Sequence, residues 1–381
     1  MQTVTHNPSD QRLQQIALAR RAVLYGGCNG AATSAQPWIE RSWQRCLASG
    51  KTPGEKPSFD MITPSAVRRL VDANQALLRT AHPMLQSLSN AIASTRYFAV
   101  MTDAQGVVID ARGAIDRSDP RADLLTRIGT DLSEHAVATT AISAALTELQ
   151  PVWLHRGEHF FDANTVYSCA GAPLFGPDGA CIGMLDLTGI DAAERPELKH
   201  LVAQSARSIE NALTLDQMTS GSDLLIRLNW PGRALGDETD GLVCLNADGY
   251  VTAANQMARL MVPQLTTPQT KTLHASDLFA MSFSMLFDAA RKQSNKAAVD
   301  VPLWTGLRLH ALPLLGIQAA ATQTAPLDAP RAAPQQPLKD IETALIRKAV
   351  DDARGNVMQA AKALGVSRAT VYRRLGSSGK R

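Results

Sequence analysis

The stretch GAPLFGPDGACIGMLDLTG, residues 171–189, decides the fold of the larger part of this chain. Two runs of apolar and β-prone residues flank a polar turn that ends in glycine, and glycine adopts the positive φ that a tight hairpin turn requires. The same arrangement recurs in YFAVMTDAQGVVIDARG (97–113) and in GLVCLNADGYVTAANQ (241–256). Three hairpins predict antiparallel sheets and not parallel βαβ units.

Segments with helical periodicity flank the hairpins. Apolar residues recur at helical spacing over 63–95, where Thr63 is expected to cap the helix. A long amphipathic helix is expected over 195–217 and leads out of the first sheet. Further along, Asn255 is expected to cap a short helix, and a strand pair is expected near 297–314. The pattern predicts a multidomain α+β protein.

Composition divides the chain into five parts. A Trp-Pro-Gly sequence breaks the helical pattern near residue 230, and residues 316–337 are rich in Ala, Pro and Gln, which is typical of a linker. The expected parts are an N-terminal arm (1–36), a first α+β domain with flanking helices (37–230), a second, smaller α+β domain (235–315), the linker (316–337) and a C-terminal module (338–381).

Length and composition limit the classes of protein that the chain can belong to. Its 381 residues favour two or three domains, and its 45% hydrophobic content suffices for folded cores. No apolar run approaches the roughly 20 residues of a membrane-spanning helix, and the polar N-terminus does not resemble a signal peptide. Five cysteines without a Cys-x-x-Cys pair favour reduced thiols in the cytoplasm: Cys28, Cys46, Cys169, Cys181 and Cys244.

The charge of the chain is unevenly distributed. The net charge is only +3, but residues 338–381 hold ten Lys and Arg against four Asp and Glu. A basic tail on a mildly acidic body is typical of a separate nucleic-acid-binding module, although a solvated basic face would give the same balance.

The basic tail contains a helix-turn-helix pattern, LKDIETALIRKAVDDARGNVMQAAKALGVSRATVYRRL (338–375). Gly355 ends the first predicted helix, Gly365 provides a left-handed turn, and a last helix with a basic outer face follows, suited to the major groove of double-stranded DNA. The alternative is a three-helix bundle that does not bind DNA. The candidate DNA-binding residues are Ser367, Arg368, Thr370, Tyr372, Arg373 and Arg374.

HRGEH (155–159) has the His-x-x-Glu-His spacing of one class of zinc protease. Such a site needs a helix, so that His155 and His159 converge on one ion, whereas Pro151 and Gly157 oppose helix. In a strand, side chains four residues apart lie about 13 Å apart, too far to share a metal. We therefore expect no metal site and no cofactor.

Three stretches carry a resemblance to a known family: IERSWQRC (39–46), LTRIGTDLSEHAVATTAISAAL (125–146) and GEHFFDANTVYSCAGAPLFGPDGACIGMLDLTG (157–189). They resemble the N-terminal sensory region of acetoin-catabolism-type bacterial transcriptional regulators, which are sigma-54 activators. The resemblance implies a GAF-like domain that encloses a small-molecule pocket over 37–230, a PAS-like domain over 235–315, and a Fis-type DNA-binding domain that works as a dimer.

The chain departs from this family in two places. Where the family has Gly-Thr-Asn-Ala-Ile-Gly, this chain has ATTAIS (138–143), and ligand preference is expected to differ if that loop borders the pocket. The family also carries an AAA+ ATPase before the DNA-binding domain, but this sequence contains no G-x-x-x-x-G-K-[ST] phosphate loop. We expect no ATP hydrolysis by that route and no opening of sigma-54 promoters by this chain alone.

Side chains around HRGEH are the candidate lining of the effector pocket: Trp153, His155, His159, Phe160, Tyr167 and Cys169. For the aromatic residues core packing is the alternative, and the histidines can equally be structural. Trp43 and Cys46 are expected to pack one helix face, Cys169 and Cys181 to face the core, and Asp186 to end a buried strand.

The function expected is a DNA-binding transcriptional regulator that senses a small molecule, acts as a homodimer and is not an enzyme. It would occlude or bend DNA, or contact RNA polymerase. Three alternatives stay open: a partner or antagonist of an AAA+ relative, an architectural DNA-binding protein, and a cysteine-based enzyme that reduces methionine sulfoxide.

Overall fold

The computed structural model describes residues 8–26, 36–219, 222–266, 273–292 and 298–315, together with residues 350, 357, 358 and 361. The chain divides into two compact units, Met1–Ala320 and Ala321–Arg381. The six candidate DNA-binding residues and Cys28 lie outside the described residues.

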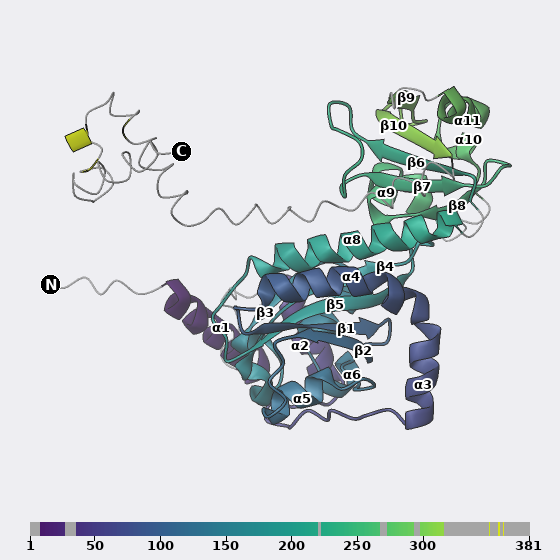
Figure 1. The fold of residues 1–381 in the computed structure, drawn as a ribbon. Coiled ribbons are helices and arrows are strands. Elements are labelled where there is room, and N and C mark those ends of the chain that lie inside the picture. The colour runs from purple at the N-terminus through teal and green to yellow at the C-terminus, as the bar shows by residue number, and fades with distance from the viewer. Residues whose placement is uncertain are drawn as a thin grey trace, which may run out of the picture. The chain divides into compact units, whose positions relative to one another are not determined.

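The first domain is built on a five-stranded antiparallel sheet with the strand order β2-β1-β5-β4-β3 (Figure 1). Its strands are β1 (Tyr97–Asp103), β2 (Val108–Gly113), β3 (Val152–His155), β4 (Tyr167–Phe175) and β5 (Cys181–Ile190). Its helices are α1 (Pro8–Leu24), α2 (Pro37–Ala48), α3 (Pro64–Ala73), α4 (Gln75–Ile92), α5 (Pro120–Thr126), α6 (Glu134–Val137), α7 (Ala141–Glu148) and α8 (Leu198–Thr219), with short 3₁₀ helices η1 (Arg156–Glu158) and η2 (Asp162–Val166).

Strand β1 shows how this sheet separates two cores. Successive side chains of a strand point to opposite faces, and every residue of β1 is buried. Phe98 and Val100 pack against residues of α2, α5 and α7. Tyr97, Ala99 and Met101 pack against α4 and α8, which lie side by side over the other face (Figure 1). Helices on both faces explain why the strands read as long apolar runs.

The second domain has its own five-stranded antiparallel sheet, with the order β8-β7-β6-β10-β9. The strands are β6 (Leu224–Asn229), β7 (Gly241–Leu245), β8 (Val251–Ala254), β9 (Val299–Pro302) and β10 (Arg308–Leu315). The helices are α9 (Gln256–Met261), η3 (Pro263–Thr266), α10 (Ala275–Leu278) and α11 (Phe283–Lys292).

This second sheet begins earlier than the predicted range of 235–315. Strand β6 follows α8 in the chain and occupies the centre of the sheet, between β7 and β10. Its side chains are buried on both faces, since Ile226 packs in one core and Leu225 in the other. The Trp-Pro-Gly sequence near residue 230 therefore follows the end of a strand and does not separate the two domains.

The fold class is confirmed, and so are the local elements predicted from turns and caps. All three hairpins form with antiparallel pairing. Thr63 accepts a hydrogen bond from the backbone N–H of Ala66, and Asn255 from that of Ala258. The helix expected over 63–95 is two helices, which meet at Asn74, where the backbone leaves the helical conformation (φ −100°, ψ 12°) and the side chain donates to the Leu70 carbonyl.

The structure gives one result on membrane association. Within the described ranges, no helix combines the length and the apolar character needed to cross a bilayer.

Candidate effector cavity

A cavity lies against the face of the first sheet that packs with α2, α5 and α7. Its volume is about 30 Å³, well below the roughly 300–1,000 Å³ typical of sites for drug-sized ligands, so it has room for only a very small molecule. Among the described residues that line it, none is Lys or Arg. The lining residues are Phe59, Leu125, Leu132, Val137, Thr140, Ala141, Ile142, His159, Asn164, Tyr167, Cys169, Asp186 and Thr188.

Three of the six candidate pocket residues line this cavity and three do not. His159, Tyr167 and Cys169 are lining residues. Trp153 packs instead in the core beneath α4 and α8, with its ring stacked on that of His155. The reason is the alternation of side chains along β3, which places both residues on the face away from the cavity. Phe160 is fully buried in the core on the cavity side, against Phe161, without reaching the cavity.

The HRGEH stretch lies at the end of a strand and not in a helix. Strand β3 ends at His155, and η1 follows at once. His155 Nδ1 lies 2.8 Å from Ser168 Oγ, whereas His159 belongs to the cavity wall, so the two imidazoles serve different places. Glu158 Oε2 accepts a 2.6 Å hydrogen bond from the backbone N–H of His155. Within the described residues, no group of three His, Cys, Asp or Glu side chains is placed to hold a metal.

His159 brings an unpaired acceptor to the cavity wall. Its Nδ1 lies 3.0 Å from the carbonyl oxygen of Arg156, and because a carbonyl only accepts, Nδ1 carries the proton. Burial lowers the pKa of His159 to about 4, so the ring is neutral near pH 7. Nε2 then holds a lone pair, and in the described part of the chain this buried atom has no hydrogen-bond partner.

Asp186 is the second unusual group of the wall. It lies in the middle of β5 and not at its end as predicted, and it is fully buried. Thr188 Oγ1 donates to Asp186 Oδ2, while Oδ1 is buried and no described residue gives it a hydrogen bond. Burial raises the pKa of Asp186 to about 7. Near neutral pH this carboxyl therefore exists in both protonation states.

Cys169 completes a short chain of hydrogen bonds with these groups. Because the Thr188 hydroxyl uses its proton on Asp186, its oxygen accepts from Cys169 Sγ at 3.3 Å. Burial, followed by the nearby Asp186, raises the pKa of Cys169, so the thiol keeps its proton. A buried, protonated thiol is a weak nucleophile.

The two strand cysteines are too far apart to work together. Cys169 pairs across the hairpin with Thr188, and Cys181 pairs with Phe175. Phe175 stands six residues further along β4 than Cys169, about 20 Å at the rise of a strand. Cys169 is buried and Cys181 half-buried. The clustered cysteines that the enzymatic alternative requires are therefore absent from this part of the structure.

The ATTAIS segment does border the cavity, through Thr140, Ala141 and Ile142. Thr140 caps α7: its Oγ1 accepts from the backbone N–H of Ser143, and Ser143 Oγ accepts from the backbone N–H of Thr140. Ala138 has φ +57° and ψ −148°, a conformation nearly confined to glycine. It is one of the two positions where the resembling family has glycine, so the chain keeps the backbone shape with a less suitable residue.

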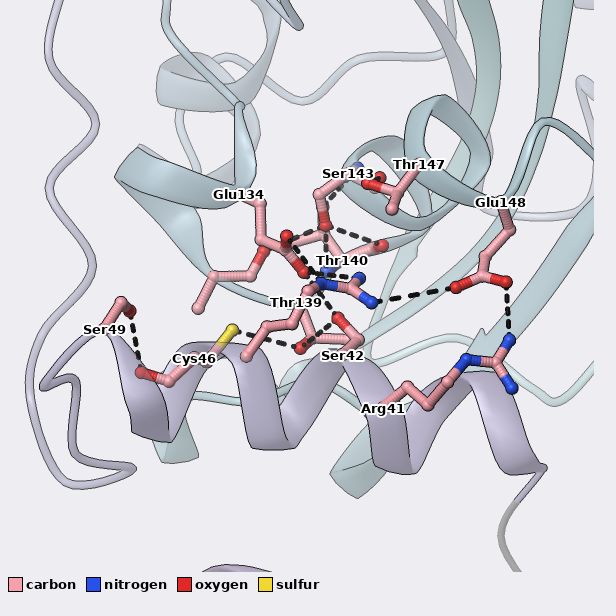
Figure 2. A network of polar contacts seen from close by, with 12 residues as sticks. Arg41, Ser42, Cys46, Ser49, Glu134, Thr139, Thr140, Ser143, Thr147 and Glu148 are labelled. Carbon is pink, nitrogen blue, oxygen red and sulfur yellow. Dashed lines mark hydrogen bonds and ion pairs between the residues drawn. The ribbon is translucent and has the colours of Figure 1, made fainter.

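A polar network fixes the ATTAIS segment against α2 (Figure 2). Ser42 Oγ donates to Glu134 Oε1 at 2.7 Å and lies 2.8 Å from Thr139 Oγ1. Arg45 Nη2 also donates to Glu134, at 3.0 Å, and Arg41 Nη2 donates to Glu148 at 2.7 Å. Helix α2 therefore contacts Thr139 within the ATTAIS segment, Glu134 before it and Glu148 after it.

Helix α2 also contacts the stretch that carries the lining residue His159. Trp43 is fully buried, and its Nε1 donates to the carbonyl of Glu158 at 3.0 Å, next to His159. Cys46 is buried on the same helix face, as predicted. The Ser-Trp-x-Arg-Cys motif thus has a structural role: its side chains contact two of the segments that line the cavity.

Sequence reasoning missed most of the wall because distant segments supply it, from Phe59 to Thr188. A signal was present for two of the missed residues. In LDLTG, polar Asp186 and Thr188 alternate with Leu185 and Leu187 inside an otherwise apolar strand. Polar groups on one face of a buried strand indicate a polar feature on that face.

Two family models match the chain. Residues 18–211 match the model described as MimR, N-terminal domain, and this is more than half of the chain. The chain belongs to this family. Residues 337–376 match a second model, Bacterial regulatory protein, Fis family. The resemblance to acetoin-catabolism-type regulators with a Fis-type helix-turn-helix is confirmed.

Two curated relatives of this MimR-family chain are named as transcriptional regulators. The acetoin catabolism regulatory protein of Cupriavidus necator is 27% identical over 261 residues, which are 66% of this chain and 37% of that protein. The propane 2-monooxygenase operon transcriptional activator MimR of Mycolicibacterium smegmatis is 28% identical over 219 residues, which are 56% of this chain and 36% of that protein. The chain thus spans little more than a third of the length of these relatives.

Among solved structures, the Escherichia coli DhaR(N)–DhaL complex is similar to the MimR-family chain. It shows 16% identity and a TM-score of 0.46, over 73% of this chain and 99% of that chain.

Proposed function

We propose that the chain is a DNA-binding transcriptional regulator whose cavity takes up a small uncharged effector. One observation carries the effector part: His159 Nε2 and Asp186 Oδ1 are both buried without a hydrogen-bond partner among the described residues, and both residues line the same cavity. Most buried polar groups in folded proteins are hydrogen-bonded, and an unsatisfied one costs about 1–3 kcal/mol. A ligand with oxygen groups would satisfy both atoms.

The two atoms also define the chemistry of that ligand. His159 Nε2 can only accept, so the ligand needs a donor such as a hydroxyl. Asp186 donates when protonated and accepts when ionised, so it suits a carbonyl or a hydroxyl. The cavity wall is otherwise largely apolar and holds no Lys or Arg among the described residues, which favours an uncharged, partly apolar molecule. Small hydroxyketones and diols meet these requirements.

The DNA-binding part rests on the Fis-family match at 337–376 and on the basic tail. That range contains all six candidate DNA-binding residues, from Ser367 to Arg374. We propose that two copies place their last helices in successive major grooves, as dimeric helix-turn-helix proteins do. Effector uptake would change operator affinity only insofar as the effector prefers one state of the dimer.

The names of the relatives fit this proposal. One regulates acetoin catabolism, and acetoin is an uncharged hydroxyketone. Because this sequence lacks a phosphate loop, the proposed output uses no ATPase of its own: occlusion or bending of DNA, or contact with RNA polymerase. A second candidate is a partner or antagonist of an AAA+ relative, favoured by the match to about a third of longer activators.

The DNA-binding proposal is tested by selecting binding sites from fragmented genomic DNA. The full chain is compared with a chain truncated at Pro337 and with Arg373→Ala. A short palindrome enriched near promoters, lost on truncation and weakened by the substitution, is expected. Equal enrichment without the tail would contradict the proposal, and no enrichment at all would favour the candidate that acts through an AAA+ partner.

The effector proposal is tested by thermal unfolding and calorimetry with acetoin, butane-2,3-diol and butan-2-one. A hydroxyl that reaches His159 should make the first or second compound bind at least about 10-fold more tightly than butan-2-one. His159→Phe, which fills space and removes the acceptor, should abolish that preference. Binding of all three with equal affinity, or of none, would count against this ligand chemistry.

A further inference from the structure

Helix α1 packs one face against the first domain. The residues of that face recur every three or four positions, with Ala19 and Arg20 side by side, which places them on one stripe of a helix: Arg12, Ile16, Ala19, Arg20 and Leu24. Gly157 lies directly beneath this stripe, since a Cβ there would meet Ile16 at 3.1 Å. Helix α1 therefore lies on the HRGEH stretch.

The loop between β3 and β4 consequently has two contacting sides. Towards the sheet it contributes His159 and Asn164 to the cavity wall. Towards α1 it presents backbone carbonyls and the carboxylates of Glu158 and Asp162. Contacts from α1 that hold the backbone of this loop therefore also hold its lining residues, His159 and Asn164, in position.

Arg20 is the main contact on the α1 side. Its guanidinium donates to the carbonyls of Gly157, at 3.1 Å, of His159, and of Phe160, at 2.6 Å. It also donates to the carboxylate of Asp162 at 2.6 Å. The planar guanidinium of Arg20 thus contacts the loop at four residues. Only an arginine side chain offers five donors in such a fixed geometry.

Arg20 is 8% exposed, although arginine is rarely buried without partners. Its burial is acceptable because its donors meet three carbonyls and a carboxylate. Arg12 makes a second, more exposed link, to Glu158 at 3.3 Å and to Glu194 at 2.9 Å. Tyr25 makes a third, donating to Asp162 at 3.0 Å at the exposed edge.

The hydrogen bond from Arg20 to the His159 carbonyl connects helix α1 to the wall of the candidate effector cavity. Arg20 holds the backbone carbonyl of His159, and the ring of the same residue donates from Nδ1 to the carbonyl of Arg156. Positions 156 and 159 of the backbone therefore set the orientation and the tautomer of the imidazole. We propose that Arg20 of helix α1 is a positioning residue for the effector site, which holds the loop so that His159 Nε2 stays available as an acceptor.

This inference rests on the proposed function, but its test needs no effector. The probe is the His159 imidazole itself, followed by nitrogen and proton NMR of the full chain with labelled histidine and assigned by His159→Gln. In the wild type, burial lowers the pKa of His159 to about 4, and the Nδ1 proton should exchange slowly. A ring found with its proton on Nε2 would contradict the proposed function as well as this inference.

Arg20→Met and Arg20→Lys are then compared with Tyr25→Phe. Arg20→Met should move the His159 pKa from about 4 towards about 6.5 and speed exchange of the Nδ1 proton. Arg20→Lys keeps the positive charge but not the planar set of guanidinium donors. A change of the His159 pKa in this variant would therefore come from lost positioning and not from lost charge. Tyr25→Phe removes one contact to Asp162 and leaves the hydrogen bonds of Arg20 intact, so the pKa of His159 should stay as in the wild type.

The outcomes decide whether Arg20 positions His159 or only stabilises the folded protein. If Arg20→Lys lowers the thermal unfolding midpoint while the His159 signals stay as in the wild type, Arg20 is merely structural and the proposal is overturned. If Arg20→Met does not fold, the lysine variant alone decides. Equal changes of the His159 signals in Tyr25→Phe and Arg20→Lys would also overturn the proposal. The packing of α1 as a whole, and not the guanidinium of Arg20, would then explain the position of His159.

Discussion

Arg259, on α9, donates from Nη2 to the carbonyl oxygen of Pro177 at 2.9 Å. Pro177 lies in the turn between β4 and β5, the hairpin that carries Asp186 to the cavity, and the backbone N–H of Ala254 donates to the same oxygen at 2.9 Å. Arg259 is itself buried and also donates to the carbonyl of Leu265 in the second domain. The tip of the cavity hairpin is therefore held by a side chain that is fixed in the second domain.

Gly179→Ala should loosen this contact. Gly179 has φ +87°, and a Cβ there would lie 2.6 Å from Arg259 Cζ. The left-handed backbone costs about 1–2 kcal/mol and overpacking about 1–3 kcal/mol, so a loss of roughly 3 kcal/mol in the free energy of unfolding is expected. Urea unfolding measures it.

Gly232→Ala is the matched control for this prediction. Gly232 has φ +88°, but no atom of the described residues would lie within 4 Å of a Cβ there, so only the left-handed penalty of about 1–2 kcal/mol is expected. Equal losses in the two variants would mean that Arg259 does not lie closely against the turn.

Ala138→Gly should stabilise the protein. At φ +57° and ψ −148°, alanine bears about 1–3 kcal/mol of backbone strain that glycine does not. The greater freedom of glycine in the unfolded chain offsets roughly 0.5–1 kcal/mol of this gain. A rise of about 1 kcal/mol in the free energy of unfolding is expected by urea unfolding.

Ala144→Gly, within α7, provides the contrast. There the backbone is helical, so glycine should lower the free energy of unfolding by about 1 kcal/mol. Destabilisation by both glycine substitutions would show that position 138 is not strained.

Much of the fold could be predicted because its signals are local. Asp-Gly turns and side-chain caps act within four residues of themselves, so the hairpins and the caps at Thr63 and Asn255 follow from short stretches. The position of β6 could not be predicted in this way. Nothing in its own apolar run says that it pairs with β10, more than 75 residues later in the chain.

The cavity could be predicted only in part, for the same reason. Closeness in sequence to HRGEH does not predict which residues line the cavity, because a strand divides neighbouring residues between its two faces. Trp153 and Leu154 therefore lie in different cores. Which face holds the cavity depends on α7 and on Phe59, which approach from elsewhere in the chain.

Thr140→Ala should remove the cap of α7 and disturb the cavity wall at once. Thr140 Oγ1 accepts from the backbone N–H of Ser143 at 3.2 Å, and the loss of such a cap costs about 1 kcal/mol. Thr140→Asn, which restores the residue type of the resembling family, keeps a good capping group and should be nearly neutral in urea unfolding. Equal destabilisation by both substitutions would assign the effect to cavity shape and not to capping.

Asp186→Asn should change how stability depends on pH in the ligand-free protein. The folded wild type holds the carboxyl proton up to about pH 7, whereas the unfolded chain releases it near pH 3.9. Folding therefore takes up a proton in this window, and the contribution of Asp186 to the free energy of unfolding falls as pH rises from about 4 to about 7. The slope is at most roughly 1.4 kcal/mol per pH unit.

The difference between variant and wild type isolates this effect. Burial lowers the pKa of His155 and His159 to about 4, and their contributions rise with pH between about 4 and 6.5, against that of Asp186. Because both proteins contain these histidines, they cancel in the difference. The free energy of unfolding of Asp186→Asn, minus that of the wild type, should therefore increase from pH 4 to pH 7 and then stay constant.

Glu210→Gln serves as the control that separates stability from ligand binding. Burial also raises the pKa of Glu210 to about 7, but this residue lies on α8, outside the cavity wall. It should show a similar pH profile in urea unfolding and bind the effector as the wild type does, whereas Asp186→Asn should alter that binding. A difference curve for Asp186→Asn that is flat from pH 4 to pH 7 would show that the carboxyl is ionised throughout, and would remove Asp186 as a donor to the effector.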